Sequence, residues 1–152
     1  MINTVKIIFT DIDGVLNSSY YNKINGGNIS AIDEKNVKNL KKIVDICGAK
    51  VVIVSRANAF LGREFDKQRV DEIKRCGVEP IDSIRDIELQ DSKAPAIKRW
   101  LAKHPDVINY VVIDDCASDF KQAFGSRFIY IKGKHGLSYK TANDAIRVLE
   151  EN

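Results

Sequence analysis

The chain has 152 residues, the length of one ordinary domain, and we expect residues 1–152 to form a single domain. Hydrophobic residues make up 44% and charged residues 30% of the sequence, which excludes an intrinsically disordered chain, and the net charge of +3 permits a polyanionic partner without requiring one. The three cysteines are widely spaced, and the sequence has neither a signal peptide nor an apolar run of membrane-spanning length. We therefore expect a soluble cytoplasmic protein without a membrane partner.

The first predicted element is a buried strand near the beginning of the chain. From Val5 the sequence is a short apolar run that stops at Asp11 and Asp13, one residue apart, with Gly14 directly after them. The run predicts a buried strand and the glycine a tight turn. Two carboxylates at such a point repel each other unless a cation joins them. We therefore expect a metal site at the end of this strand.

The other elements alternate between strands and helices. A polar loop is expected at 17–32, and further strands are predicted at 50–55, 109–115 and 127–131, with a short edge strand at 78–81 despite Pro80. Apolar residues that recur at three- and four-residue steps predict helices at 33–47, 65–76, 93–103 and 141–150. This alternation predicts an α/β fold with a parallel sheet covered by helices on both faces.

Polar side chains stand at comparable positions beside three of the predicted strands. They are Asp11 and Asp13 after the first strand, Ser55 after the second, Asp114 and Asp115 after the third, and Lys93 at the start of the helix between the last two. If these strands lie side by side in parallel, all of these residues meet at one edge of the sheet. Acids, a hydroxyl and an ammonium together suit phosphoryl transfer.

Magnesium is the cofactor that this set of side chains favours, because Mg²⁺ prefers oxygen ligands and bridges carboxylates to phosphate oxygens. Asp11 and Asp114 could supply the carboxylates, and the backbone carbonyl of Asp13 another oxygen. The hydroxyl of Ser55 could hold a phosphoryl oxygen, and the ammonium of Lys93 could neutralise its charge.

These motifs resemble those of the haloacid dehalogenase (HAD) superfamily of aspartate-nucleophile phosphatases. The first motif is Asp11-Ile12-Asp13-Gly14-Val15-Leu16, and Ser55, Lys93 and Asp114-Asp115 follow as the second, third and fourth motifs in the family's order. Residues 14–17 and the run from Lys93 to Asp115 are also similar to the small HAD group associated with RNA-repair proteins. The resemblance implies a three-layer Rossmann-like core and a phosphatase activity.

The resemblance also implies a role for each acid. Asp11 would attack phosphorus to form an aspartyl phosphate, and Asp13 would protonate the leaving oxygen and later take a proton from the hydrolytic water. Asp114 would be a direct metal ligand, and Asp115 would either bind the metal too or lie just outside the metal ligands. Asp119 stands where another form of the fourth motif has a later acid, and we expect it to cap a helix or to lie in the outer part of the site.

Two basic positions leave alternatives. Lys93 is preferred over Lys98 as the phosphate-binding lysine, because Lys93 begins a helix and Lys98 lies within it. Arg56 directly follows Ser55, so it could bind the substrate phosphate or be an exposed loop residue.

The predicted elements leave no room for a folded cap domain in 17–50 or 56–92, so the site should be open. An open site admits the end of a large molecule, and the family likeness indicates a nucleic-acid terminus or a phosphoprotein. Two sets of side chains could contribute to such binding or be ordinary loop residues: the aromatic residues Tyr20, Tyr21, Phe60 and Phe65, and the basic run Lys132, Lys134, His135 and Lys140.

Three alternatives to a macromolecular phosphatase remain. A noncatalytic phosphate-binding module and a receiver-like signalling module would use similar side chains, and a phosphatase could also act on small phosphate esters. Receiver domains have an adjacent pair of acids after the first strand, so the spacing of Asp11 and Asp13 favours the phosphatase.

Overall fold

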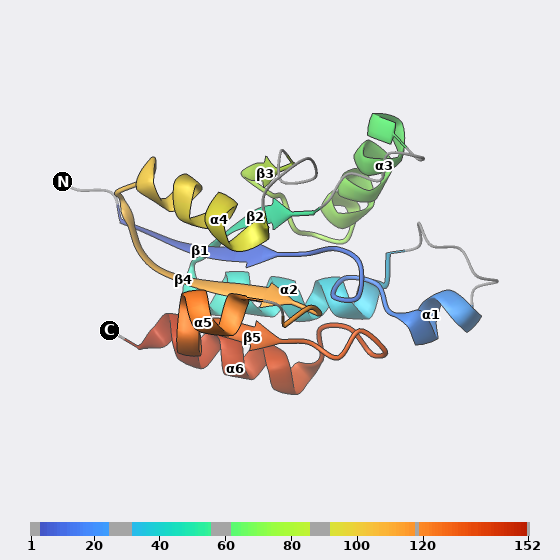
Figure 1. Cartoon of the computed structure of the whole chain (residues 1–152). Helices are drawn as coiled ribbons and strands as arrows, with labels where there is room; N and C mark the ends of the chain where they lie inside the picture. The colour runs from blue at the N-terminus through green and yellow to red at the C-terminus, as the bar shows by residue number, and fades with distance from the viewer. Residues whose placement is uncertain (1–3, 25–31, 56–61, 86–91, 118, 152) are drawn as a thin grey trace.

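The computed structural model describes residues 4–24, 32–55, 62–85, 92–117 and 119–151, with the backbone only for 62–66 (Figure 1). The strands are β1 (Val5–Thr10), β2 (Lys50–Val54), β3 (Asp82–Ile84), β4 (Val107–Asp114) and β5 (Phe128–Tyr130). The helices are α1 (Ser19–Ile24), α2 (Glu34–Cys47), α3 (Gly62–Arg75), α4 (Lys93–Ala102), α5 (Phe120–Phe124) and α6 (Tyr139–Glu150), and a 3₁₀ turn (Gly125–Arg127) follows α5.

The five strands form one parallel sheet in the order β3-β2-β1-β4-β5. β1 lies at the centre, where Phe9 pairs with Val52 of β2 on one side and with Val112 of β4 on the other. The chain builds outward from β1 to β3 and then returns to build β4 and β5 on the other side. The crevice at such a reversal, beyond the carboxyl ends of the strands, is where open α/β sheets bind ligands.

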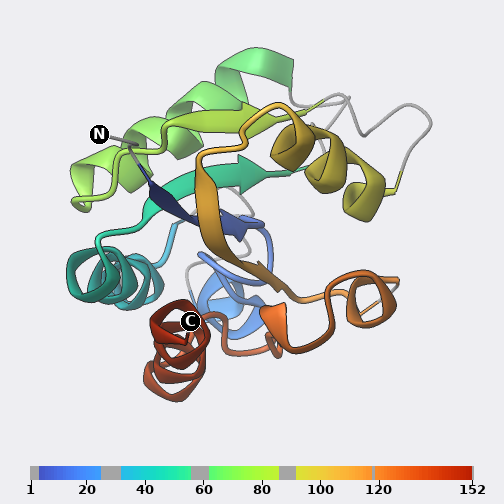
Figure 2. The same cartoon turned by 90° about the vertical axis from the view of Figure 1, so that its left-hand side faces the viewer.

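Helices cover both faces of the sheet, as the alternating strands and helices predict (Figure 2). On one face α2, α3 and α6 pack against one alternating set of strand residues, which includes Ile8 and Ile113. On the other face α4 and α5 pack against the neighbouring positions, which include Ile7, Phe9 and Val112. Successive side chains of a strand point to opposite faces, so the continuous apolar run of β1 fills both cores. The predicted three-layer Rossmann-like architecture is confirmed.

Several element boundaries differ from the sequence-based expectation. The segment expected to be loop from 17 to 32 contains the short helix α1, and α5 was not predicted. The edge strand is Asp82–Ile84 and not 78–81, because Pro80 has no backbone N–H and the first bond to β2 is made by Ile81, which donates to the carbonyl of Val51. α3 begins at Gly62, three residues before its predicted start.

The described residues of the two segments that could hold a cap domain contain one helix each. In the described residues, α1 is the one helix between β1 and α2, and α3 is the one helix between β2 and β3. Within the same described residues, no helix combines the length and the apolar character needed to cross a membrane.

Candidate active site

Asp11 directly follows the last residue of β1. Its backbone N–H still donates to the carbonyl of Ile113 in β4, at 3.1 Å, so the residue keeps its place beside that strand. Its side chain is almost buried, with 8% of the residue exposed, and its Oδ1 accepts a hydrogen bond from the N–H of Ile12 at 2.8 Å. The carboxylate is therefore held in one orientation at the floor of the crevice.

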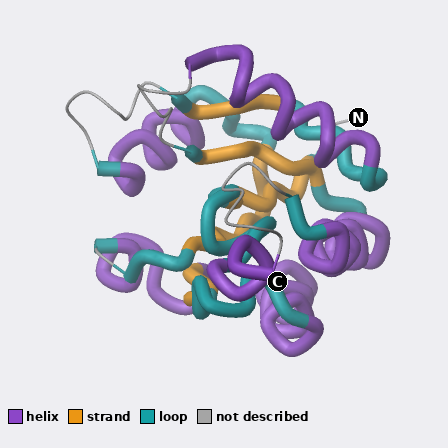
Figure 3. Tube along the Cα trace, turned by 90° about the vertical axis from the view of Figure 1, so that its right-hand side faces the viewer, coloured by secondary structure: helices purple, strands orange, loops and turns teal. Residues whose placement is uncertain are grey.

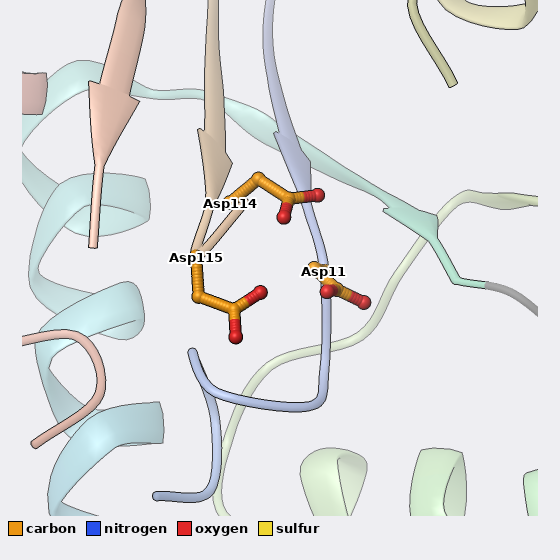
Figure 4. Close-up of side chains that lie close together, drawn as sticks. All are labelled: Asp11, Asp114 and Asp115. Atoms are coloured by element: carbon orange, nitrogen blue, oxygen red, sulfur yellow. The ribbon is translucent and has the colours of Figure 1, made fainter. Parts of the chain in front are cut away.

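Asp114 and Asp115 come from the end of the neighbouring strand β4. Asp114 is buried, its Oδ1 accepts from the N–H of Cys116 at 2.9 Å, and its carbonyl accepts from the N–H of Ile131 at 2.9 Å. Each of Asp11, Asp114 and Asp115 offers one oxygen within 4.8 Å of the others (Figure 4). The strand order thus brings Asp114 and Asp115 to Asp11, which lies about a hundred residues earlier in the sequence.

Lys93, the first residue of α4, reaches two of these acids. Its Nζ lies 3.1 Å from Oδ2 of Asp11 and 2.9 Å from Oδ2 of Asp114, and its side chain is 12% exposed. Burial by itself would lower the pKa of Lys93, but the charges of Asp11 and Asp114 outweigh burial and raise it above its ordinary value. Lys93 is therefore a permanent cation in the site.

Burial disfavours the ionised form of the acids. It raises the pKa of Asp11 from 3.8 to about 7, with the charge of Asp114 adding to the increase and Lys93 opposing it. Burial also raises the pKa of Asp115, again with a contribution from Asp114. When all three carboxylates are ionised, Lys93 compensates one of their charges, and a net charge of −2 remains.

The chemistry of this cluster fits a divalent cation. Its donors are carboxylate oxygens, which suit Mg²⁺ and similar hard cations, and one such ion carries a charge that would balance the uncompensated −2. The backbone is also shaped around Asp115. Gly14 has a positive φ of 82°, and a Cβ on it would collide with Oδ2 of Asp115, while a Cβ on Gly133 would come within 3.0 Å of the same oxygen. Two glycines therefore leave room for this carboxylate.

Asp13 lies at the mouth of the same pocket but outside the group of three acids. Its side chain is 61% exposed, and Oδ1 accepts a hydrogen bond at 2.8 Å from Arg69 of α3, which is 3% exposed. Asn17 closes the turn, because its Oδ1 accepts from the N–H of Gly14 at 3.0 Å and its Nδ2 donates to Asp13 at 3.3 Å. Asp13 is thus positioned by a buried cation and by its own loop.

A pocket of about 300 Å³ joins these side chains. Its wall contains Asp11, Asp13, Ser55, Ser92, Lys93, Asp114, Asp115, Cys116, Asp119 and Phe120. All the predicted site residues except Arg56 line it, and Arg56 falls outside the described residues, as does Phe60. Lys98, the alternative to Lys93, lies exposed farther along α4.

Asp119 takes the N-cap position of α5, as expected of a capping residue, although its side chain does not bond to that helix. Its Oδ2 accepts instead from the hydroxyl of Ser92 at 3.1 Å, and the residue is not among the three clustered acids. The arrangement places Asp115 nearer to the other carboxylates than Asp119.

Sequence reasoning missed Arg69, Asn17 and Ser92. Arg69 belongs to a helix in which charged residues are frequent, so nothing in the local sequence indicates that Arg69 is buried. Asn17 directly follows the first motif, residues 11–16, and Asx side chains often close such turns. Its role in closing the turn could therefore have been predicted from the sequence.

Comparison with solved structures supports the fold. A hypothetical protein from Xanthomonas campestris has 17% sequence identity and a TM-score of 0.53, covering 96% of this chain and 83% of its own. A proposed 3-deoxy-D-manno-octulosonate 8-phosphate phosphatase from Vibrio cholerae has 16% identity and a TM-score of 0.52, covering 99% and 88%. The cobalt-bound deoxy-D-mannose-octulosonate 8-phosphate phosphatase from Haemophilus influenzae has 15% identity and a TM-score of 0.50, covering 98% and 91%.

The family is given by the sequence itself. No curated protein matches the chain. The family model for the HAD domain in Swiss Army Knife RNA repair proteins matches the sequence over residues 7–142. This segment contains the three clustered acids and Lys93. The prediction of a phosphatase of the HAD type is thereby confirmed as to family and fold. The chain belongs to the family of HAD domains found in Swiss Army Knife RNA repair proteins.

Proposed function

We propose that this domain is a magnesium-dependent phosphomonoester hydrolase that works through an aspartyl phosphate on Asp11. The observation that carries the proposal is the position of the Asp11 carboxylate. It is buried at the floor of a pocket, in contact with the ammonium of Lys93, beside two more acids, and two residues before an exposed acid on the pocket wall. Family membership supports the same chemistry.

Asp11, Asp114 and Asp115 would hold the divalent cation, with the backbone carbonyl of Asp13 as a further oxygen. When bound, magnesium supplies positive charge that neutralises the phosphoryl oxygens and the acids around them. We propose magnesium because the donors are hard carboxylate oxygens. Phosphate release with other divalent cations should be compared with release in Mg²⁺.

The chain's own residues then divide the reaction. A carboxylate oxygen of Asp11 forms a bond to phosphorus while the bond from phosphorus to the leaving oxygen breaks, and Asp13 donates its proton to that oxygen. Asp13, now ionised, takes a proton from the water that attacks the phosphorus of the aspartyl phosphate, which releases phosphate and regenerates Asp11. Ser55, Arg56 and Lys93 would hold the phosphoryl oxygens.

We infer that the substrate is the phosphorylated end of a nucleic acid. The absence of a cap domain, which the sequence predicts, and the RNA-repair association of the family support this inference. Phosphoproteins and small phosphate esters are the competing substrate classes, and the structural neighbour from Vibrio cholerae, described as a sugar-phosphate phosphatase, favours the small esters. The free cysteines Cys47, Cys76 and Cys116 are compatible with the cytoplasmic location that we propose.

The test compares release of phosphate from phosphorylated oligonucleotides, phosphopeptides and small esters, with Mg²⁺ and with EDTA. Asp11→Asn keeps the shape of the side chain and should abolish turnover with the fold retained, whereas Asp45→Asn changes an exposed acid on α2 and should leave turnover unchanged. Full activity of Asp11→Asn would remove Asp11 as the nucleophile. Equal, poor activity on all substrates would contradict the nucleic-acid substrate, and a phosphoaspartate that persists for minutes would indicate a receiver-like module.

A further inference from the structure

We propose that α1 and the loop between β5 and α6 form a binding surface for a single nucleic-acid strand, leading its phosphorylated end to the pocket. This proposal rests on the proposed function, because it names the surface that would present that substrate to Asp11. We call it the strand surface and define it by Tyr20, Lys23, Lys132 and Lys134.

The two segments are joined to each other and to the pocket. The N–H of Ser19 donates to the carbonyl of Gly133 at 3.1 Å, and the N–H of Tyr20 donates to the carbonyl of Lys134 at 3.3 Å. Gly133 in turn lies against the carboxylate of Asp115 in the pocket wall. Figure 3 looks onto the edge where the strands end, and Figure 1 shows α1 beside the loop before α6 at that edge. The strand surface therefore begins beside Asp115, at the candidate metal site.

The charge of the strand surface has one sign. Neither 17–32 nor 131–143 contains an Asp or a Glu, whereas Lys23, Lys132 and Lys134 are exposed in them. Within the described part of the chain, none of these three lysines makes an ion pair, although most exposed lysines of α2 and α6 do so. Uncompensated lysines beside a site that is itself acidic are what a phosphate backbone would neutralise.

α1 also presents apolar surface that the fold does not cover. It has no buried residue, and Tyr20 is 57% and Ile24 62% exposed, one turn apart on the same side of the helix. An exposed tyrosine next to lysines provides a face on which an unpaired base can stack. This combination favours a single nucleic-acid strand over a phosphopeptide, which has the charge but no regular series of flat rings.

Binding can be measured separately from catalysis. Fluorescence anisotropy of a labelled single-stranded oligonucleotide with a terminal phosphate, in EDTA, reports binding when no turnover occurs, so failure of the phosphatase proposal would not affect the result. Each lysine–phosphate contact contributes roughly 0.7 to the slope of log affinity against log salt concentration for a single strand. Three such contacts predict that affinity falls about 20-fold between 50 and 200 mM salt.

Lys132→Gln combined with Lys134→Gln should reduce that loss to about threefold, because one contact remains, and should weaken binding at 50 mM salt. The matched control is Lys50→Gln with Lys74→Gln, which lowers the net charge equally at the amino-terminal end of the sheet. Equal salt dependence of the two double variants would overturn the proposal, as would the absence of binding by the wild type at 50 mM salt.

Stacking is tested on Tyr20. Tyr20→Ala should lower affinity roughly tenfold, and Tyr20→Phe, which keeps the ring, should bind as the wild type does. Equal affinity of Tyr20→Ala and the wild type would refute the role of this ring. A phosphopeptide of equal charge that displaces the oligonucleotide at the same concentration as an unlabelled strand would overturn the assignment to nucleic acid.

Discussion

Replacing Lys93 by methionine should destabilise the metal-free protein, and the loss should grow with pH. Lys93 contacts Asp11 at 3.1 Å and Asp114 at 2.9 Å, and its side chain is 12% exposed. Methionine has a similar length and fills the same space without a charge. The substitution therefore removes the cation and leaves the packing of the first turn of α4 nearly as it was.

The magnitude follows from the burial of the pair. Removing one partner of a buried ion pair costs about 3–5 kcal/mol when the remaining partner stays charged. Burial raises the pKa of Asp11 from 3.8 to about 7, so the folded state binds this proton more tightly than the unfolded chain does. The stability from that bound proton is present below about pH 4 and is lost as the pH rises through 7, at up to roughly 1.4 kcal/mol per pH unit.

Without Lys93 the pKa of Asp11 should rise further, because the ammonium opposes the effect of burial. The difference between the variant and the wild type should thus be smaller at pH 5 than at pH 8, where it should reach at most about 3–5 kcal/mol, because the higher pKa keeps part of Asp11 neutral in the variant. Urea unfolding followed by circular dichroism in EDTA at both pH values measures it. Lys98→Met, at an exposed position of the same helix, is the control and should change little. The reasoning would be refuted if Lys93→Met unfolded with the same free energy as the wild type at pH 8, or if the variant lost the same stability at both pH values.

Further predictions concern the metal, the turn and the acid. Mg²⁺ at 100 times its dissociation constant should stabilise the wild type by about 2.7 kcal/mol at pH 8, measured as a shift of the urea midpoint, and no shift would exclude a magnesium site. Gly14→Ala should destabilise more than Gly48→Ala and weaken metal binding in a calorimetric titration; both glycines have positive φ, but only a Cβ on Gly14 meets Asp115, so equal effects would contradict the crowding. Arg69→Met should release Asp13 and slow hydrolysis of an alkyl phosphate about tenfold, with a smaller loss for p-nitrophenyl phosphate, whose leaving group needs no proton; an equal loss on both would indicate a structural role only.

The local pattern of the sequence was enough for the core of the fold. The apolar runs before Asp11, Ser55 and Asp114 are strands because branched residues buried on both faces form such runs, and each is followed at once by a polar residue. Helix α2 was recognisable for the same reason, since its apolar residues recur with helical spacing and Gly48 ends it with a left-handed conformation. Short elements such as α1 and α5 carry too few residues to show a period.

What only the tertiary structure decided is which ends meet. The sequence by itself determined that acids follow two buried strands, but the pairing of β1 with β4 brings Asp114 and Asp115 to Asp11. Burial of Arg69 beside Asp13 and the seating of α1 on the loop before α6 also depend on contacts between distant segments. Such contacts follow from how whole helices and strands pack, and periodicity within one segment does not contain them.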